Sequence, residues 1–125
     1  MKSDAFKLAA ETKDFAKAEE LFAPDAVFCS PAVFKPYEGL EALGVILGTV
    51  AQVFEDFRYL DQVETGDTAV LVFEARVGGK QLNGVDVLRF DEDGKISELM
   101  VMIRPLSGLM ALGEEMGRRL AAASG

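Results

Sequence analysis

The chain has 125 residues, of which 50% are apolar and 27% are charged, a composition typical of one folded globular domain. At this length about two-thirds of the unfolded chain's surface can be buried, so a hydrophobic core needs no disulfide or metal ion. With 13 basic and 21 acidic residues, the net charge of −8 disfavours nucleic acid and anionic lipid as partners. The lack of histidine excludes the Ser-His-Asp triad and histidine-based zinc sites.

Cysteine use and hydropathy indicate the compartment. Cys29 is the only cysteine, which excludes disulfides within the chain and CxxC metal sites and fits a reducing compartment. The N-terminal residues are charged and lack the apolar stretch of a signal peptide, and the longest apolar run, 40–54, is too short and too polar to span a bilayer. We therefore expect one cytoplasmic domain, residues 1–125, with no cofactor, metal ion or membrane span.

Helical spacing and turn-forming residues divide the first part of the chain. Ser3 or Asp4 is placed to cap a first helix, and helical spacing resumes at Asp14. The remaining expected features are a helix end at Pro24 and Asp25, a strand over 26–30, an irregular loop between Pro31 and Gly39, and a helix from near Gly39 to 54.

From residue 57 the apolar period becomes two, and turn-forming residues recur at the spacing of hairpins. The predicted strands are 57–64, 68–77, 80–90 and 95–104, joined as an antiparallel meander. After Pro105 an apolar stripe predicts a helix within 106–125, ending in an Ala/Ser/Gly tail that we expect to fray.

Helices first and strands afterwards predict an α+β fold, in which a cone-shaped, curved antiparallel sheet wraps around the N-terminal helices. The strand over 95–104 is apolar on both faces, with Leu99, Val101 and Ile103 on one face and Met100 and Met102 on the other. Because the helices cover only one face, we expect a homodimer formed through the other face of the sheet.

A resemblance to a known family rests on the order of elements and on two segments, "LFAPDAVFCSPAVFKPYEG" and "NGVDVLRFDEDGKISEL". Over about residues 6–104 the chain resembles the nuclear transport factor 2-like superfamily, and more narrowly its branch of ketosteroid isomerases and SnoaL-like polyketide cyclases. In ketosteroid isomerase an Asp base moves a proton, while a Tyr and a protonated Asp donate hydrogen bonds to the dienolate oxygen.

The resemblance assigns these three roles to positions of this chain. The hydrogen-bonding Asp matches Asp86, the base matches Ser30, and the Tyr matches Phe6. Since Ser and Phe cannot take over these roles at neutral pH, the resemblance disfavours ordinary ketosteroid isomerisation. Tyr37 could replace the missing donor or simply anchor its loop, and Tyr59 is interpreted as sheet packing.

Alternation places Asp86 on the inner face of its strand, where burial should raise the pKa of the carboxyl and favour the protonated, hydrogen-bond-donating form. Cys29 and Ser30 point to opposite faces, and Ser30 is expected to line the pocket. The predicted pocket residues are Asp86, Phe6, Phe28, Ser30, Phe34, Tyr37, Val50, Phe54, Phe73, Val101 and Ile103, with Leu71 as a further wall candidate.

The predicted function is binding of a small hydrophobic, oxygen-bearing ligand of steroid, polyketide or terpenoid type, held by Asp86 as a candidate oxyanion donor. The resemblance implies proton-transfer isomerisation or cyclisation as the reaction class, if the protein is an enzyme. The alternative is a non-catalytic dimeric interaction module of the same fold. A cavity smaller than about 300 Å³ would favour that alternative.

Overall fold

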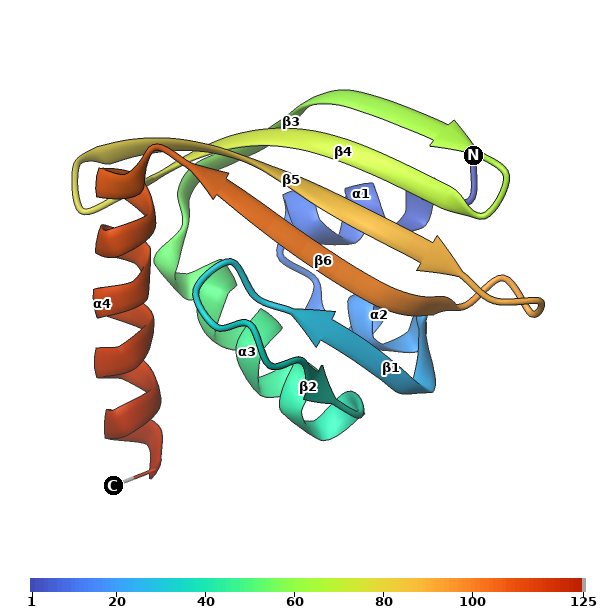
Figure 1. The fold of residues 1–125 in the computed structure, drawn as a ribbon, viewed down its shortest axis with the longest axis horizontal. Coiled ribbons are helices and arrows are strands. Elements are labelled where there is room, and N and C mark those ends of the chain that lie inside the picture. Colours follow the sequence, from blue (N-terminus) through green and yellow to red (C-terminus); the bar gives the residue numbers. More distant parts are fainter. Residues whose placement is uncertain (125) are drawn as a thin grey trace.

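The computed structural model describes residues 1–124 and has the predicted α+β fold, in which helices α1–α3 lie on one side of a curved, open sheet (Figure 1). Six strands follow the order β2-β1-β6-β5-β4-β3. The strands are β1 (Phe22–Cys29), β2 (Tyr37–Glu38), β3 (Glu55–Thr65), β4 (Thr68–Val77), β5 (Lys80–Phe90) and β6 (Ile96–Arg104). The helices are α1 (Asp4–Thr12), α2 (Phe15–Glu20), α3 (Leu40–Val53) and α4 (Leu106–Ser124).

The predicted antiparallel meander is confirmed in strands β3 to β6. Strands β4 and β5 have the predicted boundaries, because Gly78 and Gly79 adopt the positive φ angles of 54° and 84° that a tight hairpin requires. Inner-face side chains of β4 and β5 are buried in strict alternation, which puts the core between the sheet and the helices.

Strand β1 differs from the prediction. It begins at Phe22 rather than at residue 26, and it pairs with β6 in parallel, so the sheet is mixed rather than wholly antiparallel. Pro24 and Asp25 do not end a helix but lie in this strand, where the ladder with β6 is interrupted between Phe22 and Val27. A break in the ladder tolerates a proline, which has no N–H to donate.

The N-terminus is tied to strand β3. Ser3 stands at the N-cap of α1, but its hydroxyl donates to Oε1 of Glu64 at 2.8 Å instead of capping the helix. Helical spacing resumes at Asp14 as predicted, and Oδ1 of Asp14 caps α2 by accepting a hydrogen bond from the backbone N–H of Lys17. The contact of Ser3 with Glu64 ties the start of α1 to β3, whereas the contact of Asp14 is local to α2.

Helix α4 runs along one end of the sheet and beside α3 (Figure 1). Leu112 is its buried anchor. The helix continues to Ser124, so the described part of the Ala/Ser/Gly tail is helical, and Gly125 lies outside the described residues. Among the residues that the structure describes, no helix combines the length and the apolar character needed to cross a bilayer.

Candidate functional site

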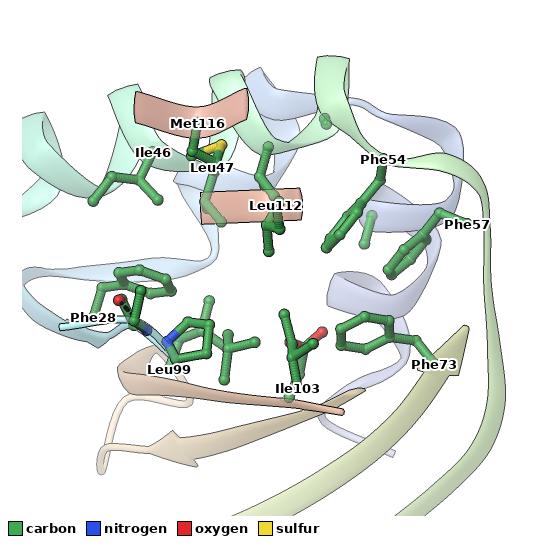
Figure 2. A pocket seen from close by; sticks show the side chains of 18 of the residues that line it. Phe28, Ile46, Leu47, Phe54, Phe57, Phe73, Leu99, Ile103, Leu112 and Met116 are labelled. Carbon is green, nitrogen blue, oxygen red and sulfur yellow. Dashed lines mark hydrogen bonds between the residues drawn. The ribbon is translucent and has the colours of Figure 1, made fainter. Parts of the chain in front are cut away.

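A cavity of about 330 Å³ lies between the concave face of the sheet and the helices (Figure 2). Figure 2 shows Leu112 and Met116 of α4 across the cavity from Leu99 and Ile103 of β6. Its volume is above the limit of about 300 Å³ below which binding of a polycyclic ligand becomes implausible. The large side chains of the core therefore do not fill the centre of the cone.

Most of the predicted pocket residues lie together around this cavity. Asp86 lines it, as do Phe6, Phe28, Ser30, Tyr37, Val50, Phe54, Phe73, Val101 and Ile103. Leu71 is completely buried in the core and does not reach the cavity.

Phe34 is the predicted pocket residue that the structure places elsewhere. Its ring is fully exposed on the loop between β1 and β2 and does not line the main cavity. The hydroxyl of Ser30 accepts hydrogen bonds from the N–H groups of Ala32 and Val33, which turns the loop so that Val33, rather than Phe34, faces the cavity.

Asp86 is the only acidic residue among the described residues that line the cavity. Its side chain is 7% exposed, and Oδ2 accepts a hydrogen bond of 2.5 Å from the hydroxyl of Tyr59. Within the described part of the chain Oδ1 has no hydrogen-bond partner. Oδ1 is therefore the carboxyl oxygen left available to a ligand.

Burial controls the protonation of this pair. Desolvation raises the pKa of Asp86 from 3.8 to about 7, and the hydrogen bond from Tyr59 opposes part of that rise. Desolvation, followed by the nearby Asp86 charge, raises the pKa of Tyr59 well above 10, so Tyr59 stays a donor. At neutral pH the carboxyl thus exchanges readily between a neutral donor form and a charged acceptor form.

Tyr59 does not act in sheet packing alone, because its hydroxyl group also donates a hydrogen bond to Asp86 in the cavity. It stands on β3, across β4 from Asp86, so the contact joins strands that are not neighbours. Alternation with Phe57 on an apolar face was the available signal for its inward direction. No local pattern could have paired it with Asp86.

An aromatic wall holds Tyr59 in place. The ring centroids of Phe57 lie 4.9 Å from Tyr59 and 5.1 Å from Phe73. Phe73 packs against Gly84, where an added Cβ would come within 2.3 Å of the ring. A glycine beside Asp86 on β5 thus makes room for the aromatic ring next to the acid.

Helix α4 forms a part of the wall that the sequence did not predict. Its apolar stripe indicated a helix, but not that Leu109, Leu112 and Met116 would line the cavity. Lys13, on the segment between α1 and α2, was also missed. The described residues contain no group of three or more side chains suited to bind a metal ion.

An open, curved sheet packed around helices, with an apolar cavity in its concave face, defines a protein of the nuclear transport factor 2-like class. The family model of the SnoaL-like domain matches residues 4–99, and the chain belongs to this family. No curated protein matches it significantly.

Three solved structures show the range of similarity. A steroid delta-isomerase from Pseudomonas aeruginosa is 48% identical, with a TM-score of 0.93 over 98% of this chain and 90% of that one. An uncharacterised bacterial protein with a cystatin-like fold from Silicibacter pomeroyi is 29% identical, with a TM-score of 0.92 over 96% of this chain and 85% of that one. A putative SnoaL-like polyketide cyclase from Shewanella denitrificans is 15% identical, with a TM-score of 0.68 over 94% and 95% of the two chains, and shows the shared fold alone.

Proposed function

We propose that the protein binds a hydrophobic, oxygen-bearing small molecule in the cavity and that Oδ1 of neutral Asp86 donates a hydrogen bond to the ligand's oxygen. The observation that carries the proposal is the buried Tyr59–Asp86 pair in a mostly apolar cavity, with Oδ1 facing no protein partner among the described residues. A buried carboxyl group without a full set of partners is costly, and such groups are concentrated at functional sites.

Proton-transfer isomerisation or cyclisation is the reaction class that we propose. When a carbon-bound proton next to a carbonyl is removed, negative charge develops on the oxygen, and a donor aimed at that oxygen stabilises the enolate. The similarity to a steroid delta-isomerase at 48% identity supports this class. Because no second carboxylate lines the cavity in the described residues, we propose substrates acidic enough to need little help from a base.

Ser30 does not supply the missing base in this proposal. Its hydroxyl oxygen already accepts two backbone N–H groups, so it stabilises the loop at the cavity. A serine hydroxyl without an adjacent base is a weak proton acceptor at neutral pH. Ordinary ketosteroid isomerisation with a carboxylate base is therefore not the activity that we propose.

Self-association through the outer face of the sheet is a second part of the proposal. Two cross-strand rows there are wholly apolar, Val70–Val87–Met100 and Val72–Val85–Met102. Their valines and Met100 are partly buried, and Met102 is exposed. An apolar sheet face of this kind is typical of an interface. The same face is what favours the rival function, a non-catalytic dimeric module. We also propose a cytoplasmic location, which the single cysteine supports.

A thermal-shift titration with planar phenols and steroid enones tests the proposed function. Wild type should be stabilised increasingly as ligand is added, by about 2.7 kcal/mol at one hundred times the dissociation constant. Asp86→Ala should lose the shift. Asn83→Ala is the matched control, because Asn83 lies on the same strand with its side chain on the opposite face, bonded to Arg104.

Two outcomes would count against the proposal. If none of these ligands raises the unfolding temperature of wild type, the proposal of a steroid-binding pocket is wrong, and the interaction module is favoured. A shift that persists in Asp86→Ala would show binding in which the acid has no part.

A further inference from the structure

Lys13 stands at the mouth of the cavity. It lies on the turn between α1 and α2 and is exposed, yet it lines the cavity together with Ala10 and Phe15 from the neighbouring helices. Among the described residues that line the cavity, it is the only one with a positive charge. A cation at the rim of an apolar cavity is placed to meet one end of an entering ligand.

The ammonium group of Lys13 has no acidic partner within the described residues. Nζ donates one hydrogen bond, of 3.2 Å, to the backbone oxygen of Phe54. The acids closest in sequence are bound elsewhere, since Glu11 accepts from the N–H of Tyr59 and Asp14 accepts from the N–H of Lys17. The ammonium group thus keeps two free N–H donors and an uncompensated charge.

The backbone of Lys13 supports a role for its side chain. Its φ of 57° and ψ of 38° are left-handed, a conformation in which glycine is usual at the end of a helix and a side chain costs free energy. Residues held in such conformations are concentrated at ligand sites. The hydrogen bond to Phe54, which ties the end of α1 to the end of α3, engages one of the three N–H groups only.

We propose that the ligand is an amphipathic acid, whose apolar body fills the cavity and whose anionic group, such as a carboxylate, binds to Lys13 at the mouth. The inference rests on the proposed function, in which Asp86 meets an oxygen of the same ligand. The chain's net charge of −8 repels anions at long range. A preference for an acid over a matched neutral ligand therefore has to come from a local cation.

A matched pair of steroid enones tests the inference, 3-oxo-4-androstene-17β-carboxylic acid and its methyl ester. They share the ring system and the enone and differ in the charge. At pH 6.5 and low salt, isothermal titration should show that wild type binds the acid about 3 to 10 times more tightly than the ester, as expected for a partly exposed charged pair.

Three substitutions distinguish a local effect of Lys13 from an effect of the protein's overall charge. Lys13→Met keeps the aliphatic stem and should abolish the preference for the acid while leaving the affinity for the ester within about twofold. Lys17→Met is the control, because it removes the same charge from the exposed face of α2, and it should keep the preference. Lys13→Arg restores the charge at the mouth and should also keep it, even if Lys13→Met is poorly folded.

The inference is overturned if wild type binds acid and ester equally, or if Lys13→Met keeps the preference. The proposed function survives either result as long as the ester binds and requires Asp86. If neither compound binds to wild type, the proposed function fails, and the inference fails with it.

Discussion

The hydroxyl of Tyr59 donates a hydrogen bond of 2.5 Å to Oδ2 of Asp86, although the two residues lie on strands separated by β4. This contact fixes which oxygen of the carboxyl is free. When Asp86 is neutral and Tyr59 keeps its donor role, the acid's proton is carried on Oδ1, the atom available to the cavity. Tyr59 therefore orients the acid rather than replacing the tyrosine donor of ketosteroid isomerase.

Tyr59→Phe removes this hydrogen bond. The hydrogen bond from Tyr59 stabilises the charged carboxylate and so lowers the pKa of Asp86. Without it, desolvation should raise that pKa further, above about 7. A buried carboxyl that loses its partner should also cost about 1–3 kcal/mol of stability. Carboxyl ¹³C NMR titration measures the pKa, and Tyr37→Phe, at the mouth of the same cavity, should leave it unchanged. An unchanged pKa in Tyr59→Phe would contradict the account.

Asp86→Asn tests the cost of burying the acid. The folded-state pKa is raised from 3.8 to about 7, so stability contributed by this group is fully present below pH 3.8 and is lost as pH rises to about 7. Wild-type stability relative to Asp86→Asn should thus fall by about 4 kcal/mol between pH 3.8 and pH 8.

Denaturant unfolding of both proteins at several pH values gives this difference. Asp93→Asn, in the exposed turn between β5 and β6, is the control and should follow wild type at each pH. A difference between wild type and Asp86→Asn that does not vary with pH would show that Asp86 is not desolvated in the folded protein.

Much of the sheet could be predicted from the sequence because its signals are local. Gly78 and Gly79 mark a hairpin, and alternation along β5 correctly places Asp86 on the inner face. The parallel pairing of β1 with β6 has no such signal, because it joins segments about 70 residues apart along the chain. The periodicity of a single sequence indicates local elements and does not show which distant strands pair.

The candidate site was predictable in its acid, in much of its wall and in Ser30 and Tyr37, but not in Tyr59 and Lys13. Tyr59 reaches Asp86 across an intervening strand, and Lys13 reaches the cavity from a turn. Both positions depend on how separate elements pack. Phe34, by contrast, was predicted to line the pocket and does not. An aromatic residue in the loop was expected to point inward, but the turn at Ser30 directs it outward.

Gly84→Ala should destabilise the protein by about 1–3 kcal/mol through overpacking. The added Cβ would lie 2.3 Å from the Phe73 ring and 2.9 Å from the backbone oxygen of Met102. Gly117→Ala, where nothing lies within 4 Å, is the control and should stabilise α4 by up to about 1 kcal/mol. Urea unfolding measures both, and equal stabilities for Gly84→Ala and wild type would refute the close packing of Phe73 on Gly84.

Met102→Glu tests self-association through the outer face. Light scattering should give wild type twice the chain mass of 13.5 kDa and the variant the monomer mass, because a charge would be buried without a partner. Met110→Glu changes an exposed methionine of α4 and should leave the dimer intact. A monomeric wild type at micromolar concentration would rule out this dimer.

The most direct test of the account is the pH dependence of affinity for a neutral steroid enone, measured on wild type and Asp86→Asn. An enone oxygen only accepts hydrogen bonds, so it requires the neutral form of Asp86. Wild-type affinity should be constant below pH 7 and fall by about tenfold per pH unit well above it, whereas Asp86→Asn should show no such fall. An affinity independent of pH in wild type, or an equal fall in both proteins, would contradict the claim that neutral Asp86 holds the ligand.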